Sequence, residues 1–162
     1  MATTTTAELV QPTAGAREDP TARLPITVVV ADDHEQTRRR LRLTLHANED
    51  LDVVGVARDL PTTQRQVIEH APRVLLLDLG MPGGSTTELI RRLRAQVPKT
   101  QIVVVTMEDS PVVAEHAMAA GALGYVLKHH ADAELVDAIR CAAQGKAYIS
   151  PRLRRRAQAS PA

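Results

Sequence analysis

Five polar side chains stand at the ends of short apolar runs in this sequence, and together they could carry phosphate chemistry. These side chains are Asp32, Asp33, Asp78, Thr106 and Lys128. Clustered carboxylates repel one another unless a cation lies between them, and ligands that are all oxygen favour Mg²⁺. A hydroxyl and an ammonium beside that cation would bind and neutralise phosphoryl oxygens. A single acidic loop residue is ordinarily just solvated, but such groups at successive run ends indicate a magnesium-dependent phosphoryl-transfer site.

The apolar runs themselves have the composition of buried strands. They span residues 26–31, 53–57, 74–77, 102–106 and 124–127. Four of the five read as apolar without alternation, which is typical of strands covered on both faces. Between the runs, apolar residues recur at helical spacing, as Leu41 and Leu45 or Leu89 and Leu93 do. This alternation predicts an α/β fold with a parallel sheet between two helix layers. The carboxyl ends of its strands would bring the polar residues to one edge.

The length of 162 residues suits one domain with tails. Residues 1–24 are rich in Thr and Pro and contain no apolar segment, so we expect a flexible N-terminal tail rather than a secretory signal. Residues 25–148 are expected to form the folded domain. Residues 149–162 contain several arginines and no apolar periodicity, so we expect a flexible basic C-terminal tail.

The composition excludes several classes of binding protein. The net charge of +1 argues against a nucleic-acid binder that works by bulk charge. Two tyrosines, with no Phe and no Trp, exclude an aromatic platform for stacking bases. The single cysteine, Cys141, excludes an internal disulfide and fits a reducing cytoplasm. No run approaches the roughly 18 apolar residues that a membrane span needs, so we expect a cytoplasmic protein without membrane contact.

Five segments, in order along the chain, carry a resemblance to a known family. They are VVVADDH at 28–34, LLLDLGMPGG at 75–84, VVVTM at 103–107, AAGALGYVLK at 119–128 and AYISP at 147–151. The sequence resembles a response-regulator receiver domain of two-component systems. It is most similar to receivers at the front of NarL/FixJ (LuxR-type) transcription factors, here without the helix-turn-helix output domain. The resemblance covers residues 25–150. The set of motifs in this order is more specific to the family than any single motif is.

The resemblance implies a role for each site residue. Asp78 would be the phosphoacceptor. Asp33 and Asp78, with the backbone carbonyl of Gly80, would bind Mg²⁺ directly, and Asp32 would bind it through water. The resemblance further implies that Thr106 and Lys128 bind the phosphoryl oxygens, and that Tyr125 is a rotameric switch that turns inward when Thr106 moves.

The resemblance also implies the fold and the partners. The fold would be flavodoxin-like, with a doubly wound five-stranded parallel sheet in the order 2-1-3-4-5 and five helices. The partners would be a cognate histidine kinase and either a second copy or an output protein that binds the 111–128 face. Ser110 and Pro111 predict the start of a helix on that face. We expect its residues Val113, Ala117 and Gly121 to pack on the sheet, which leaves outward Val112, Glu115, His116 and Ala119. We expect no direct sequence-specific DNA binding by this chain, and no enzymatic activity beyond self-catalysed phosphorylation and dephosphorylation.

Two alternatives remain open at this point. The chain could be the receiver part of a DNA-binding transcriptional regulator whose helix-turn-helix domain is absent here. It could also be a hydrolase of the haloacid-dehalogenase type, which uses Asp, Thr and Lys with Mg²⁺. That class needs a second Asp two residues after the nucleophile as acid and base, and Gly80 stands at that position. The hydrolase interpretation is therefore the weaker one.

Overall fold

The computed structural model describes residues 24–159, so the expected N-terminal tail lies outside the described residues except for Leu24. At the centre is a six-stranded parallel sheet in the order β2-β1-β3-β4-β5-β6. The strands are β1 (Ile26–Ala31), β2 (Leu51–Ala57), β3 (Val74–Leu77), β4 (Gln101–Thr106), β5 (Gly124–Leu127) and β6 (Tyr148–Ile149). The first five strands confirm the predicted order.

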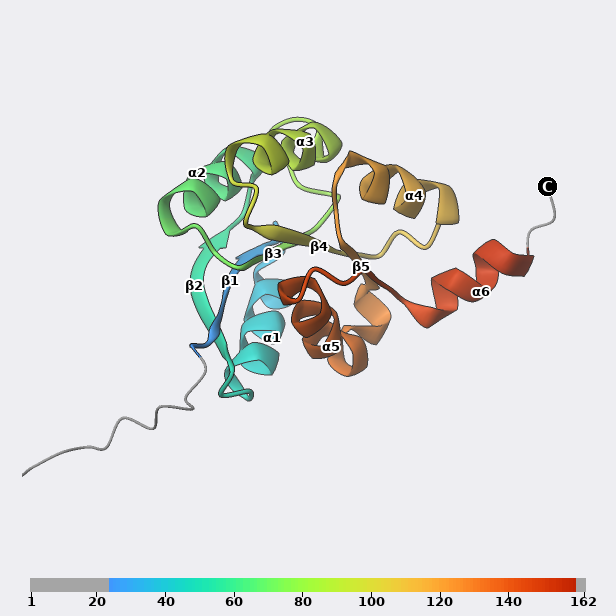
Figure 1. The fold of residues 1–162 in the computed structure, drawn as a ribbon, viewed down its shortest axis with the longest axis horizontal. Coiled ribbons are helices and arrows are strands. Elements are labelled where there is room, and N and C mark those ends of the chain that lie inside the picture. The colour runs from blue at the N-terminus through green and yellow to red at the C-terminus, as the bar shows by residue number, and fades with distance from the viewer. Residues whose placement is uncertain (1–23, 160–162) are drawn as a thin grey trace, which may run out of the picture.

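Helices cover both faces of this sheet, as the apolar strands require. They are α1 (Glu35–His46), α2 (Leu60–His70), α3 (Thr86–Gln96), α4 (Pro111–Ala120), α5 (Ala131–Ala143) and α6 (Pro151–Ala159), with a 3₁₀ turn at Lys128–His130. Helices α2, α3 and α4 form one layer, and α1 and α5 form the other (Figure 1). Each layer packs on its own apolar core cluster. Within residues 24–159, no helix is both long and apolar enough to cross a bilayer.

Helix α4 begins as the sequence predicts but turns a different face inward. The Ser110 side chain caps the helix by accepting a hydrogen bond from the Val113 backbone N–H, with Pro111 in the first turn. We expected Val113, Ala117 and Gly121 to face the sheet, but the buried residues are Ala114, Ala117 and Ala120. The error arises because alanines dominate this helix and leave its apolar periodicity ambiguous.

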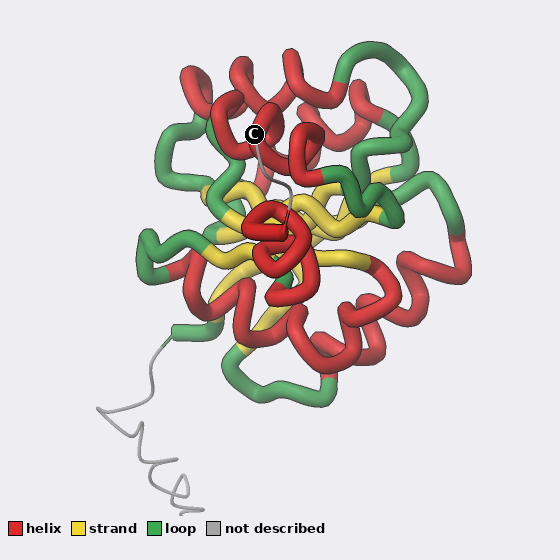
Figure 2. The backbone as a smooth tube through the Cα atoms, turned by 90° about the vertical axis from the view of Figure 1, so that its right-hand side faces the viewer, coloured by secondary structure: helices red, strands yellow, loops and turns green. Residues whose placement is uncertain are grey.

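The prediction of a flexible tail at 149–162 is wrong for the residues that the structure describes. Residues 148–149 form β6, which pairs in parallel with β5, and α6 follows it. The Ser150 backbone N–H donates to the Tyr125 carbonyl at 2.9 Å, and Leu153 is buried. Figure 2 looks onto α6, which lies at the end of the sheet between the two helix layers. The sequence did not predict this helix because Leu153 is its one buried residue, so it has no apolar periodicity.

Candidate functional site

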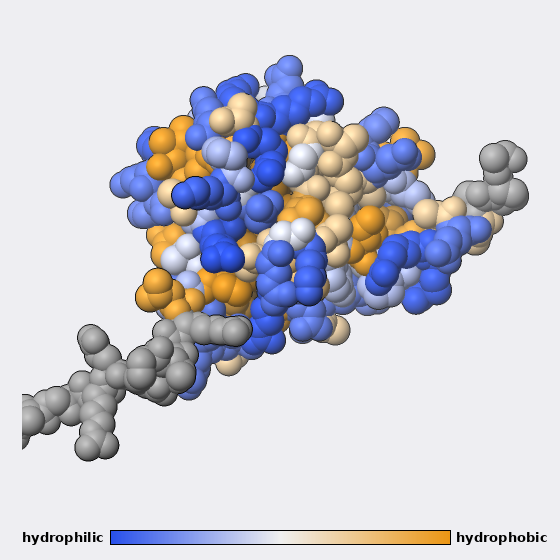
Figure 3. All heavy atoms as spheres, in the orientation of Figure 1, coloured by the Kyte–Doolittle hydropathy of each residue, from blue (hydrophilic) through white to orange (hydrophobic). Residues whose placement is uncertain are grey.

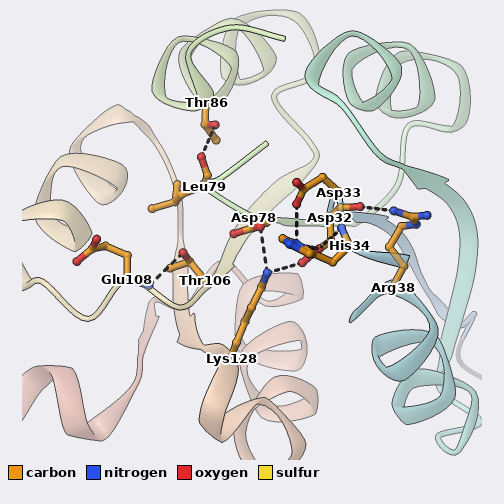
Figure 4. Close-up of polar contacts among 10 residues, drawn as sticks. All are labelled: Asp32, Asp33, His34, Arg38, Asp78, Leu79, Thr86, Thr106, Glu108 and Lys128. Carbon is orange, nitrogen blue, oxygen red and sulfur yellow. Dashed lines mark hydrogen bonds and ion pairs between the residues drawn. The ribbon is translucent and has the colours of Figure 1, made fainter. Parts of the chain in front are cut away.

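The acidic residues are positioned by two neighbouring strands. Asp32 and Asp33 follow β1, and Asp78 follows β3, whose carboxyl end lies beside that of β1. The Asp78 backbone N–H donates to the Ala31 carbonyl at 3.0 Å, and the Asp32 N–H donates to Ala57 at 3.1 Å. The side chains of Asp32 and Asp78 are buried, whereas Asp33 is exposed. The backbone ladder therefore brings two buried carboxylates to one point, as Figure 4 shows.

Lys128 offsets part of the negative charge of these two carboxylates. Its ammonium Nζ lies 2.7 Å from Asp32 Oδ2 and 3.0 Å from Asp78 Oδ2. Burial disfavours the ammonium, but its contacts with the two carboxylates outweigh burial and raise the pKa of Lys128 above its ordinary value. Lys128 therefore stays cationic at neutral pH. Its position at the end of β5 was predicted from the sequence.

The acidic group has the donor set and the geometry that suit a hard divalent cation. Asp32, Asp33, His34 and Asp78 each offer one ligand atom, and these atoms all lie within 4.8 Å of one another. Asp32 Oδ2 is buried, and the Lys128 ammonium is its close partner among the described residues. One ammonium offsets only one of the three clustered carboxylates, so a hard divalent cation would complete the charge balance. The residues therefore fit Mg²⁺.

Gly80 lies next to this cluster. A Cβ added at Gly80 would be 3.6 Å from Asp78 Oδ2, which is ordinary van der Waals contact. The glycine is exposed and follows the acidic residue by two positions. The role of Gly80 in the site, with its backbone carbonyl as a ligand, stays a prediction.

Two further residues of this site, His34 and Arg38, were not among the residues that the sequence predicted. His34 Nδ1 lies 2.8 Å from Asp33 Oδ1, and its backbone N–H donates to Asp32 Oδ1 at 2.9 Å. Arg38 donates from Nη1 to the Asp32 carbonyl at 2.7 Å. Both hold the loop between β1 and α1 (Figure 4). The available signal was their closeness in sequence to the acidic pair.

Thr106 and Tyr125 are joined through the loop that follows β4. Thr106 Oγ1 accepts a hydrogen bond from the Glu108 backbone N–H at 3.3 Å. The Tyr125 hydroxyl donates to the Glu108 carbonyl at 2.9 Å. Tyr125 is completely buried, and burial together with nearby carboxylates, Glu108 first, raises the pKa of its hydroxyl. The hydroxyl therefore remains a neutral hydrogen-bond donor, and the ring occupies an inward position.

The loop after Asp78 is fixed from α3. Thr86 Oγ1 donates to the Leu79 carbonyl at 2.9 Å. Figure 4 shows Thr106 across Asp78 from Asp33, so Asp78 lies between the acidic pair and the hydroxyl. The structure thus brings the predicted aspartates and Lys128 together around Asp78, with Thr106 on the side of Asp78 away from Asp33. Such an arrangement can hold a cation on one side of a carboxylate and an anion's oxygens on the other.

Comparison with known proteins identifies relatives of this chain. The model of the response regulator receiver domain family matches residues 28–140. The oxygen regulatory protein NreC of Staphylococcus epidermidis is 36% identical over 127 residues, which are 78% of this chain and 58% of that protein. The chain therefore spans less than two thirds of the length of such curated relatives.

Solved structures agree in fold. The signal receiver domain of the putative response regulator NarL from Mycobacterium tuberculosis is 30% identical, with a TM-score of 0.73. The match covers 76% of this chain and 100% of that chain. The isolated REC domain of RcsB from Salmonella enterica serovar Typhimurium, solved with the phosphomimetic BeF₃⁻, is 28% identical with a TM-score of 0.75. That match covers 81% of this chain and 97% of that chain.

Proposed function

The chain belongs to the response regulator receiver family, as a receiver of the NarL and NreC type, and from this premise we propose that Asp78 accepts a phosphoryl group. The donor is a cognate histidine kinase of a two-component system. The observation that carries the proposal is the buried pair Asp32 and Asp78, which share the Lys128 ammonium at the carboxyl edge of the sheet. One carboxylate of such a pair can act as nucleophile because the cation offsets the charge of the other.

The proposed transfer makes one bond and breaks one bond. An Asp78 carboxylate oxygen attacks phosphorus in line, and the bond from phosphorus to the donor's imidazole nitrogen breaks, which leaves an acyl phosphate on Asp78. The Thr106 hydroxyl donates a hydrogen bond to one phosphoryl oxygen. The Lys128 ammonium moves from the Asp78 carboxylate to another phosphoryl oxygen. Tyr125 holds the inward position beside the moved loop.

The metal site belongs to the same proposal. Asp33 and Asp78, with the Gly80 carbonyl, would hold Mg²⁺ directly, and Asp32 would hold it through water. When bound, the ion supplies positive charge to the phosphoryl oxygens. The closeness of the ligand atoms that Asp32, Asp33 and Asp78 offer, all within 4.8 Å of one another, supports this assignment.

The test is intact-mass spectrometry after incubation with acetyl phosphate and Mg²⁺. We expect the gain of one phosphoryl group, which hydroxylamine removes because it is an acyl phosphate. Asp78→Asn should abolish the gain, since an amide is not a competent nucleophile. Asp33→Ala should slow it, and the matched control Asp52→Asn, an exposed aspartate on β2, should leave it unchanged. Full phosphorylation of Asp78→Asn would overturn the assignment.

We propose that the output is a protein contact through the 111–128 face, made with a second copy or an output protein in the cytoplasm, and not direct sequence-specific DNA binding. On α4 the residues Val112, Glu115, His116 and Ala119 face outward as predicted, and Val112 is 59% exposed. Val112→Asp should abolish association that depends on beryllofluoride, as measured by light scattering and pull-down. Val56→Asp, an exposed valine on β2, is the control. Equal behaviour of the two variants would place the surface elsewhere.

A further inference from the structure

Helix α6 covers part of the α4 face. The helix packs against α4, and an apolar groove of about 480 Å³ runs between them. Its apolar lining includes Ala114, Met118 and Ala119 on one side and Ile149, Leu153 and Ala157 on the other. Figure 3 shows hydrophobic residues in this region beside the hydrophilic surface of α6. Helix α6 therefore blocks this part of α4 from binding a partner.

Few side chains of α6 attach it to the rest of the domain. Within α6 only Leu153 is buried, at 2% exposure. The second attachment is an ion pair between Arg156 and Asp109, whose side chains are 51% and 44% exposed. An exposed ion pair of this kind contributes little to stability. Helix α6 can therefore detach at low cost without unfolding of the sheet.

Asp109, the ion-pair partner of α6, sits in the loop that Thr106 holds. Its neighbour Glu108 donates from its N–H to Thr106 Oγ1 and accepts from Tyr125 at its carbonyl. The Glu108 side chain in turn accepts from the Ser110 N–H at 3.1 Å. The loop between β4 and α4 is thus one hydrogen-bonded unit, attached to the site at Thr106 and to α6 at Asp109.

We infer that α6 is a displaceable cover of the α4 face, and that phosphorylation of Asp78 releases it through Thr106, Glu108 and Asp109. This inference rests on the proposed function. A phosphoryl oxygen draws the Thr106 hydroxyl toward Asp78 and away from the Glu108 N–H, a contact that is already long at 3.3 Å. The loop shifts with it, the Asp109 carboxylate leaves Arg156, and α6 loses its ion pair to the loop.

The consequence is that the part of the output surface beneath α6 opens in the signalling state. Release of α6 exposes the apolar side chains of α4 beneath it, next to the outward residue Val112. Because coupling between two sites is reciprocal, detachment of α6 must also favour binding at Asp78 by the same factor. A mutation in α6, far from any phosphoryl group, therefore changes the affinity of the site.

Hydrogen exchange of the full chain, with Mg²⁺ alone and with added beryllofluoride, tests this inference. We expect exchange of residues 151–159 to rise about fivefold with beryllofluoride, while the strands of the sheet keep their protection. Asp109→Asn and Arg156→Gln should raise the exchange of residues 151–159 even without beryllofluoride. The matched controls are Asp137→Asn on α5 and Arg155→Gln on α6, whose side chains form no ion pair among the described residues.

Leu153→Ala supplies the reciprocal measurement. We expect this variant, which frees α6, to bind beryllofluoride about fivefold more tightly than the parent chain. Gain of protection around residues 78–82 without any change at 151–159 would overturn the inference and leave the proposed function intact. An unchanged affinity in Leu153→Ala would overturn it as well. Absence of both protection at 78–82 and acetyl-phosphate labelling in the parent chain would overturn the proposed function itself.

Discussion

The pocket around Asp78 and the C-terminal helix α6 lie at the ends of adjacent strands, yet they are held in different ways. The pocket residues lie at the carboxyl ends of β1, β3, β4 and β5, and neighbouring strands in this set are hydrogen-bonded to one another. Helix α6 follows the two-residue strand β6 and the buried Ser150, and its own residues are anchored by one buried leucine and one exposed ion pair. The difference shows which part of the molecule can be rigid and which can move. The pocket around Asp78 belongs to the rigid part, and helix α6 belongs to the part that can move.

The largest expected effect is at Lys128. Lys128→Met leaves the buried carboxylates of Asp32 and Asp78 without a counter-charge, so the free energy of unfolding should fall by about 3–5 kcal/mol without Mg²⁺. Added Mg²⁺ should recover part of this loss, and the rate of phosphorylation should fall about 100-fold. Urea unfolding with and without Mg²⁺, and mass spectrometry with acetyl phosphate, measure the two effects.

Lys99→Met, an exposed lysine, is the control for that substitution. In the parent chain the raised pKa of Lys128 means that its stabilising contribution is complete below the ordinary lysine value of 10.5. That contribution is lost only as the pH rises through the higher folded-state pKa. If Lys128→Met lowered the free energy of unfolding no more than Lys99→Met does, the Lys128 ammonium would not stabilise the pocket.

A second pair of substitutions compares the core with the cover. Leu135 in α5 and Leu153 in α6 are both buried leucines, at 0% and 2% exposure. Leu135→Ala should lower the free energy of unfolding by about 2–5 kcal/mol, the usual cost of a cavity in a core. Leu153→Ala should lower it by less than about 1 kcal/mol, because α6 detaches locally instead. Equal losses in urea unfolding would show that α6 unfolds together with the domain.

The same contrast explains what the sequence could predict. Strands β1, β3 and β5 have the predicted bounds because their apolar runs are buried on both faces and end sharply at polar residues. Asp78 and Lys128 could be found for that reason, since each is the first polar residue after such a run. The pairing of parallel strands then carries them to one edge without any detail of the loops.

What the sequence could not predict depends on single contacts between distant segments. Helix α6 is strongly polar, and its burial of Leu153 needs α4 and Ile149 to be in place already. His34 is exposed, so no buried pattern marked its contact with Asp33. The phase of α4 was misjudged because Ala114 and Ala120 are too small to dominate an apolar pattern.

A smaller effect is expected at the hydrogen bond from Tyr125 to Glu108, which holds the loop between β4 and α4. Tyr125→Phe removes only the donation to the Glu108 carbonyl, so the free energy of unfolding should fall by about 0.5–1.5 kcal/mol. Hydrogen exchange in α6 should rise, because the loop that carries Asp109 is then held at Thr106 alone. Tyr148→Phe is the control, since the Tyr148 hydroxyl has no hydrogen bond among the described residues. An identical result for the two variants would remove Tyr125 from the coupling.

The smallest effect is expected at Gly80, which tests the pocket without disturbing the cover. A side chain fits there because the nearest atom to an added Cβ is Asp78 Oδ2, at 3.6 Å, and the glycine is exposed. Gly80→Arg should therefore leave folding unchanged and shield the acyl phosphate from in-line water, which lengthens its half-life about threefold, a barrier increase below about 1 kcal/mol. Gly80→Ala is the control, because one methyl group is too short to cover phosphorus. The decay of the phosphorylated mass after removal of acetyl phosphate gives both half-lives. Equal half-lives for the two variants, at equal initial labelling, would show that access of water past Gly80 does not limit the signal.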